Sequence, residues 1–142
     1  MLVTEILKAK GDEVFTCAPD ISLQEAAREL QARKVGALLV LEKDRVVGIF
    51  SERDVVRAVA DDGAPALERP VRTYMTKKVL VALPTETVDE LMGRMTDRRV
   101  RHLPVMREEK LCGIVSIGDL VKSRIAETVL EAETLKHYIV HG

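Results

Sequence analysis

The sequence predicts an α/β (α+β) fold made of two similar β-α-β-β-α units and a C-terminal helix. A nonapeptide repeats, because GIFSERDVV at residues 48–56 returns as GIVSIGDLV at residues 113–121. The repeat extends further, since residues 14–56 align with residues 79–121 without a gap and are identical at 12 of 43 positions. Self-similarity at a fixed period indicates a repeated structural unit. A unit of about 60 residues has a marginal core alone, so we expect the two units to pack through their sheets around a pseudo-two-fold axis.

Each unit is expected to begin with a short strand and to continue, after a helix, into a two-stranded hairpin. The runs EVFTCAP (13–19) and KVLVALP (78–84) favour β structure and are stopped by proline. Polar turns, KDR and EEK, separate the later strands. The expected hairpin strands are VGALLVLE (35–42) and VVGIF (46–50) in the first unit, and VRHLPVMR (100–107) and LCGIV (111–115) in the second.

The first helix of each unit is marked by a hydroxyl residue followed three positions later by a glutamate. Ser22 with Glu25, and Thr87 with Glu90, form such capping boxes. Apolar residues follow both boxes at helical spacing. A helix is therefore expected to start at each box.

The domain boundaries follow the internal repeat. The segments VTEIL (3–7) and VRTYM (71–75) match each other and are expected to be short helices that precede the units. Polar, turn-forming residues between the units are typical of a linker. We divide the chain into the first repeat (1–60), the linker (61–70), the second repeat (71–125) and a C-terminal helical tail (126–142).

Composition and charge exclude several classes of partner. The chain is 46% hydrophobic and 32% charged, with a formal net charge of −1. This balance is typical of a soluble globular protein and gives no basic excess for binding nucleic acid. No apolar run approaches the roughly 20 residues that span a bilayer. Cys17 and Cys112 have no metal-like or redox-like spacing, so we expect two core thiols in a reducing cytoplasm.

A serine and an aspartate recur in both copies of the nonapeptide, as Ser51 with Asp54 and Ser116 with Asp119. One interpretation is purely structural, because each pair is a capping box for the helix that follows. The other is functional, because a helix N-terminus presents N–H groups and a positive dipole to an anion. The two interpretations are compatible, and the residues alone leave both open.

The pattern strand-Gly-x-x-Ser-x-x-Asp, present twice in a β-α-β-β-α setting, resembles the cystathionine-β-synthase (CBS) domain. Two tandem copies resemble a Bateman module of the standalone bacterial signal-transduction type. The resemblance covers about residues 3 to 125 and also rests on RRVRHLPVM (98–106) and YMT (74–76). It implies a regulatory module that binds an adenosine-containing ligand between the repeats. That ligand class includes AMP, ADP, ATP, NAD(H) and S-adenosylmethionine.

The resemblance also implies two sites, each shared between the repeats. In the family the aspartate contacts the ribose hydroxyls, and the serine or threonine contacts phosphate or ribose oxygens. The first implied site consists of Ile49, Ser51, Asp54, Thr76, Lys78, Leu80, Arg101 and His102. The second consists of Ile114, Ser116, Asp119, Phe15, Gly36, Ala37 and Arg53.

The two implied sites differ in charge. Arg101 and His102 of the second repeat correspond to Gly36 and Ala37 of the first, so the first site is expected to carry more positive charge. Adjacent residues of a strand point to opposite faces, so only part of this basic cluster can face a ligand. Arg101 is expected to contact phosphate, with a solvated charged face as the alternative. His102 is either a ligand contact or a histidine of the core or rim.

No catalytic constellation is visible. The sequence lacks a P-loop, a Gly-x-Gly-x-x-Gly motif and a Gly-x-Ser-x-Gly motif, and we predict neither catalytic residues nor a metal site. The favoured hypothesis is a ligand sensor without turnover. A structural dimerisation module that binds no nucleotide is the alternative, and a nucleotide-converting enzyme is a third, disfavoured hypothesis.

The C-terminal tail is expected to contribute to a homodimer. Apolar residues return at helical spacing in IAETVLEAETLKHYI: Ile125, Val129, Ala132 and Ile139. A helix with an apolar stripe must bury it. We expect the stripe to pack across a homodimer, with folding back on its own module as the alternative.

Overall fold

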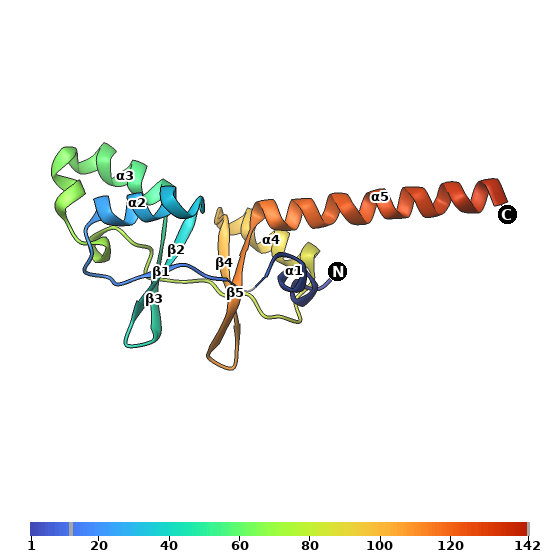
Figure 1. The fold of residues 1–142 in the computed structure, drawn as a ribbon, viewed down its shortest axis with the longest axis horizontal. Coiled ribbons are helices and arrows are strands. Elements are labelled where there is room, and N and C mark those ends of the chain that lie inside the picture. Colours follow the sequence, from blue (N-terminus) through green and yellow to red (C-terminus); the bar gives the residue numbers. More distant parts are fainter. Residues whose placement is uncertain (12, 142) are drawn as a thin grey trace. The chain divides into compact units, whose positions relative to one another are not determined.

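The computed structural model of the chain describes residues 1–11 and 13–141. The chain divides into two compact units, one formed by residues 13–80 and the other by residues 1–11 together with 81–141. Figure 1 labels their helices and strands. The expected mixed α/β class and the C-terminal helix are confirmed.

The unit of residues 13–80 is a three-stranded sheet with its helices. The strands lie in the order β1-β2-β3, with β1 parallel to β2 and β2 antiparallel to β3. Ser22 caps the first helix by accepting a hydrogen bond from the Glu25 N–H, as the capping box predicts. The elements are β1 (Thr16–Cys17), α2 (Leu23–Arg33), β2 (Ala37–Glu42), β3 (Arg45–Ser51), α3 (Glu52–Asp62) and the 3-10 helices η1 (Ala64–Glu68) and η2 (Val71–Thr73).

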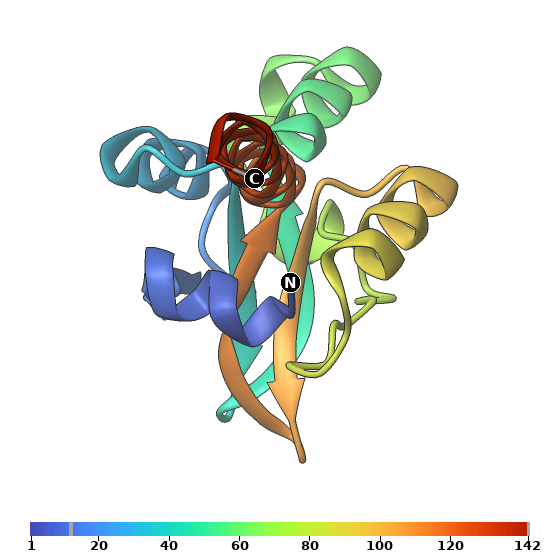
Figure 2. The ribbon, with the colours of Figure 1, turned by 90° about the vertical axis from the view of Figure 1, so that its right-hand side faces the viewer.

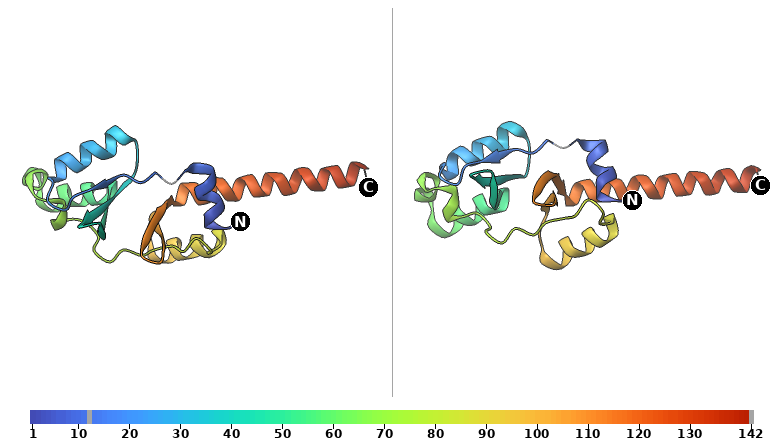
Figure 3. Two further views of the ribbon diagram at one scale, coloured as in Figure 1. Left: turned by 60° about the horizontal axis from the view of Figure 1, so that its bottom comes forward. Right: turned by 90° about the horizontal axis from the view of Figure 1, so that it is seen from below.

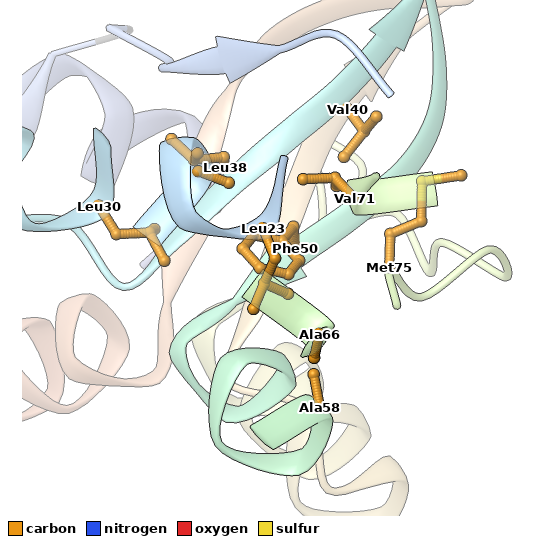
Figure 4. Close-up of a cluster of buried hydrophobic side chains, with 10 residues drawn as sticks. Leu23, Leu30, Leu38, Val40, Phe50, Ala58, Ala66, Val71 and Met75 are labelled. Carbon is orange, nitrogen blue, oxygen red and sulfur yellow. The ribbon is translucent and has the colours of Figure 1, made fainter. Parts of the chain in front are cut away.

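The core of this unit collects apolar side chains from the sheet, both α-helices and the segment that follows α3 (Figure 4). Leu23 and Phe50 are fully buried at its centre. Ala66 of η1 and Met75, just after η2, complete it. The segment 61–70, expected as a polar linker, therefore contains a 3-10 helix and contributes to the core.

The second unit is a hairpin with three helices. Thr87 caps its helix by accepting from the Glu90 N–H, again as predicted. Figure 2 shows α1 against the hairpin, where it contacts β5. The elements are α1 (Val3–Lys10), α4 (Val88–Arg98), β4 (His102–Arg107), β5 (Lys110–Ser116) and α5 (Ile117–His141).

The prediction of a strand at residues 78–84 is wrong. This segment makes only an isolated parallel bridge between Ala82 and Val105. In the first unit the Leu39 N–H donates to the Phe15 carbonyl at 3.1 Å and extends the ladder. The corresponding residue of β4 is Pro104, which has no N–H to donate. One proline thus explains why the second sheet has two strands.

The segment that precedes each repeat in the sequence packs on the other repeat. Residues 71–80 belong to the first unit and residues 1–11 to the second. Equivalent backbone hydrogen bonds anchor both segments at the turn before the first helix. They run from Val71 N–H to Ile21 O and Arg72 N–H to Pro19 O in one unit, and from Val3 N–H to Glu86 O and Thr4 N–H to Pro84 O in the other.

The last helix, α5, continues without a break from Ile117 to His141 (Figure 3). The equivalent helix α3 ends at Gly63, which has a φ of 70° and precedes Pro65 by two positions. No glycine or proline lies between Asp119 and His141. The tail expected from residue 126 is therefore an extension of the second repeat's last helix.

Candidate functional site

The two Ser–Asp pairs stand where a central strand turns into a helix. At the start of α3, the Ser51 N–H donates to Asp54 Oδ2 at 2.9 Å, and the Ser51 hydroxyl lies 3.3 Å from the same oxygen. At the start of α5, the Ser116 N–H donates to Asp119 Oδ2 at 2.9 Å, and Ser116 Oγ accepts from the Asp119 N–H at 3.1 Å. The structural interpretation of both pairs as helix caps is therefore confirmed.

The helix starts have fewer free donors than the sequence suggests. The first N–H of α3, from Glu52, donates to the Gly36 carbonyl at 3.1 Å. The first N–H of α5, from Ile117, donates to the Arg101 carbonyl at 2.8 Å. An anion at either helix start would find these two N–H groups already occupied, so side chains must supply more of its binding.

Four further candidates lie beside the helix start of their own repeat. Ala37 pairs with Ser51 across the β2–β3 hairpin. His102 pairs with Ser116 across the β4–β5 hairpin. Gly36 and Arg101 immediately precede these strand residues, and their carbonyls hold the first helical N–H groups.

The first unit contains six of the eight residues of the first predicted site. Ile49 and Thr76 exchange two backbone hydrogen bonds, at 3.0 and 2.9 Å, next to Ser51 and Asp54. Lys78 is exposed and Leu80 half-buried in the chain that follows. Six predicted residues thus occur in one unit, on or after the end of β3: Ile49, Ser51, Asp54, Thr76, Lys78 and Leu80.

The remaining candidates divide between the units. Phe15 and Arg53 belong to the first unit with Gly36 and Ala37, whereas Ile114 belongs to the second. Phe15 is stacked under Arg33, whose guanidinium carbon lies 4.8 Å from the ring centroid. Arg53 is exposed on the first turn of α3. The sharing of each site between repeats stays a prediction.

Asp54 is a buried carboxylate, with only 5% of its surface exposed. Burial raises the pKa of Asp54, and the opposing hydrogen bonds from Ser51 and the charge of Arg57 do not cancel it. The nearest guanidinium atom of Arg57 is 3.6 Å from Asp54 Oδ1 and belongs to a largely exposed side chain. Asp54 therefore keeps acceptor capacity that its neighbours only partly use.

Asp119 has the same position in the second repeat but a different environment. Lys10 of α1 places its ammonium 2.7 Å from Asp119 Oδ2 and 2.8 Å from the Ile114 carbonyl oxygen. Burial acts to raise the pKa of Asp119, but the bonds from Lys10 and the Ser116 N–H outweigh it and lower that pKa below its usual value. The pKa values of the two motif aspartates are thus shifted in opposite directions.

The model of the CBS domain matches this chain twice, at residues 3–61 and 71–126. The chain belongs to the CBS-domain family. A CBS-domain protein from Agrobacterium tumefaciens has a crystal structure with 48% identity and a TM-score of 0.85, covering 87% of this chain and 92% of that one. The mitochondrial CBS-domain protein CBSX3 of Arabidopsis thaliana is 32% identical over 149 residues, covering 99% of this chain and 72% of the relative.

A third relative was solved with ligands. The CBS pair of protein MJ0100 was crystallised with 5′-methylthioadenosine and S-adenosyl-L-methionine. It is 25% identical to this chain, with a TM-score of 0.78, and the match covers 89% of this chain and 98% of that one. Both molecules contain adenosine, so a CBS pair of this fold binds that class of ligand.

Two further features of this CBS pair concern metals and membranes. Among the described side chains, no three histidine, cysteine, aspartate or glutamate residues are grouped as a metal site would require. None of the described helices has the length and apolarity needed to cross a bilayer.

Lys10, which contacts the candidate residue Asp119, was missed by sequence reasoning. The segments before the two CBS repeats align at an offset of 68, and this offset pairs Lys10 with Lys78. Lys78 is among the predicted site residues, so the alignment contained the signal for Lys10. Its partner could not be read from the sequence, because α1 lies more than a hundred residues from Asp119 along the chain.

Proposed function

We propose that this CBS pair is a regulatory sensor, without turnover, for an adenosine-containing ligand of the AMP, ADP, ATP or NAD(H) class. The observation that carries the proposal is the buried Asp54 carboxylate in the first turn of α3. A carboxylate accepts two hydrogen bonds from the vicinal hydroxyls of a ribose, and burial strengthens such bonds. A charged group kept in a buried position against its desolvation cost is a functional-site candidate.

The surroundings of Asp54 suit the rest of a nucleotide. Ile49 is half-buried beside it and offers an apolar surface for the adenine ring. Thr76 and Lys78 are exposed on the adjoining segment and can supply a hydroxyl and a positive charge to phosphate. Arg101 is exposed at the start of β4, and we assign it to the phosphate as well.

The solved complexes of a CBS pair with 5′-methylthioadenosine and S-adenosyl-L-methionine support the adenosine part of the proposal. Those ligands share the adenine and the ribose diol and differ beyond the 5′ carbon. We therefore assign recognition of the diol to the motif aspartates and expect the 5′ substituent to be chosen by the surrounding charges. The two free thiols of Cys17 and Cys112 suit a cytoplasmic location for such a sensor.

Thermal melting with a panel of ligands tests the proposal. Adenosine, AMP, ATP, NADH and S-adenosylmethionine are each added to the full chain, with guanosine as the control for base recognition. A ligand at 100 times its Kd adds about 2.7 kcal/mol to the free energy of unfolding. A melting temperature that no adenosine compound raises contradicts the proposal. Product analysis after incubation with ATP or NADH tests the assignment as a non-enzyme.

A structural dimerisation module is the second candidate, and two observations favour it. Both Ser–Asp pairs are complete as helix caps, so their presence needs no ligand. Helix α5 also exposes apolar residues: Ile125, Val129, Leu130, Leu135 and Ile139. We propose that this helix packs against a second copy of the chain in a homodimer. Dimerisation without any ligand-dependent melting is the result that favours this candidate over the sensor.

A further inference from the structure

The ammonium of Lys10 bridges two acceptors of the second repeat. Its Nζ donates to the Ile114 carbonyl at 2.8 Å and to Asp119 Oδ2 at 2.7 Å. The side chains of Lys10 and Asp119 are only 32% and 25% exposed, so solvent screens this ion pair incompletely. The bridge ties α1 to Ile114 near the end of β5 and to Asp119, the residue proposed to hold ribose, in the first turn of α5.

The first repeat satisfies the equivalent carbonyl in another way. The Ile49 carbonyl accepts from the Thr76 backbone N–H at 2.9 Å. This is possible because the 3-10 helix η2 ends at Thr73, and Thr76 then forms an isolated antiparallel bridge with Ile49 of β3. In the second unit, α1 stays helical as far as Lys10, so a side chain takes the place of the backbone donor.

The geometry points to Lys10 as a specificity-determining residue that distinguishes the second site from the first. Asp54 has Ser51 as its hydrogen-bond partner and the charges of Arg57, at 3.6 Å, and Arg53 near it, whereas Asp119 is held directly by an ammonium at 2.7 Å. Oδ2 of Asp119 already accepts from Lys10 and from the Ser116 N–H, so a nucleoside diol that uses both carboxylate oxygens must displace Lys10. This inference rests on the proposed function of the motif aspartates.

The displaced lysine defines the ligand class. A nucleoside 5′-phosphate brings an anion that can receive the ammonium released from Asp119, whereas adenosine offers no such group. The second site is therefore expected to prefer a nucleoside 5′-phosphate to the nucleoside. When such a ligand binds, its phosphate replaces Asp119 as the partner of the Lys10 ammonium.

Calorimetric titration with adenosine and with AMP tests this inference. Asp54→Asn is used as the background, so that the remaining binding reports on the second site. Lys10→Met keeps the aliphatic stem and removes the charge. It should strengthen adenosine binding by about fivefold, since it removes a competing, partly buried ion pair, and it should weaken the preference for AMP. The matched control is Lys8→Met, an exposed lysine of the same helix.

The outcomes separate the inference from the proposed function. If Lys10→Met and Lys8→Met bind adenosine with the same affinity, and also bind AMP with the same affinity, the proposed role of Lys10 is overturned. If Asp54→Asn weakens adenosine and AMP binding relative to the wild-type chain while Lys10→Met changes nothing, only this inference is lost. Absence of adenosine and AMP binding to the wild type and to every variant overturns the proposed function and the inference together. Carbon NMR titration of Asp119 checks that Lys10→Met has removed the ion pair, by a rise in the carboxyl pKa.

Discussion

Gly48 lies directly against Met75. A Cβ atom on residue 48 would meet Met75 Sδ at 2.6 Å and the Thr76 carbonyl oxygen at 3.0 Å. The same relationship joins Gly113 to Leu7, whose Cδ2 would be 2.8 Å from such a Cβ. The glycine of each nonapeptide therefore lets the segment that precedes the other repeat pack closely on the central strand, next to the Ser–Asp pair.

Gly48→Ala should destabilise the protein by about 1–3 kcal/mol, because the added methyl group displaces the buried Met75 side chain and crowds the Thr76 backbone carbonyl. Gly93→Ala is the matched control, since nothing lies within 4 Å of a Cβ at this position in α4. There the loss of a helical glycine should stabilise by about 0.5–1 kcal/mol. Urea denaturation measures both changes. Equal effects of the two substitutions would show that the close approach is unimportant.

The two motif aspartates should respond in opposite ways to removal of their charge. Burial raises the folded-state pKa of Asp54, so its ionised form costs stability above its ordinary pKa, and Asp54→Asn should stabilise the protein at pH 7. Lys10 and Ser116 lower the folded-state pKa of Asp119 despite its burial, so its charge stabilises the fold above the unfolded-state pKa. Asp119→Asn should therefore destabilise at pH 7.

The pH dependence provides the control for this pair of variants. The contribution of Asp119 is lost as pH falls through its lowered folded-state pKa. The deficit of Asp119→Asn, measured by urea denaturation from pH 7 to pH 3, should therefore shrink at the acid end. Two variants that change stability in the same direction at pH 7 would contradict the contrast between the sites.

The sequence predicted the repeated architecture because its signals are local. Capping boxes at Ser22 and Thr87 and the alternation of strand and turn residues determine where elements begin. The exchange of the segments before the repeats could not be predicted, because it depends on contacts between parts of the chain that are distant in sequence. Nor does the similarity of VTEIL and VRTYM show that one forms α1 and the other the 3-10 helix η2. The pairing of Lys10 with Asp119 follows from that long-range exchange, so it too was invisible.

The absence of the expected strand at residues 78–84 shows a second limit of prediction from the sequence. Its sequence favours β structure, but a strand needs donors and acceptors on its neighbour. Pro104 removes one donor from β4, and this residue lies about twenty positions further along the chain. The β propensity of a segment can be read from its own residues, whereas its pairing also depends on the residues of the neighbouring strand.

Truncation of α5 tests the proposed homodimer. A chain that ends after Arg124 lacks the exposed apolar residues Ile125, Val129 and Ile139. Light scattering at micromolar concentration should show a dimer for the full chain and a monomer for the truncated chain. A truncated chain that stays dimeric would remove α5 from the interface, and a monomeric full chain would contradict the dimer itself.

Arg101→Ala tests the predicted charge difference between the sites. If Arg101 contacts phosphate, its loss should weaken ATP binding by about tenfold, on the scale of one charge-assisted hydrogen bond, and should leave adenosine binding unchanged. ATP affinity in the wild type should also fall as salt rises. Arg98→Ala, at the end of α4, is the control for general loss of positive charge. Equal losses of ATP affinity in the two variants would identify only a charged surface.

We propose that Asp54 binds the ribose diol, and a titration cycle with two ligands and two proteins examines this contact. Adenosine and 2′,3′-dideoxyadenosine are titrated into Asp119→Asn, in which binding is restricted to one site, and into the double variant that also carries Asp54→Asn. We expect loss of the two hydroxyls to weaken binding by about tenfold or more where Asp54 is present, and by much less in the double variant. An equal loss of affinity in the two proteins would contradict the claim that this carboxylate recognises the diol.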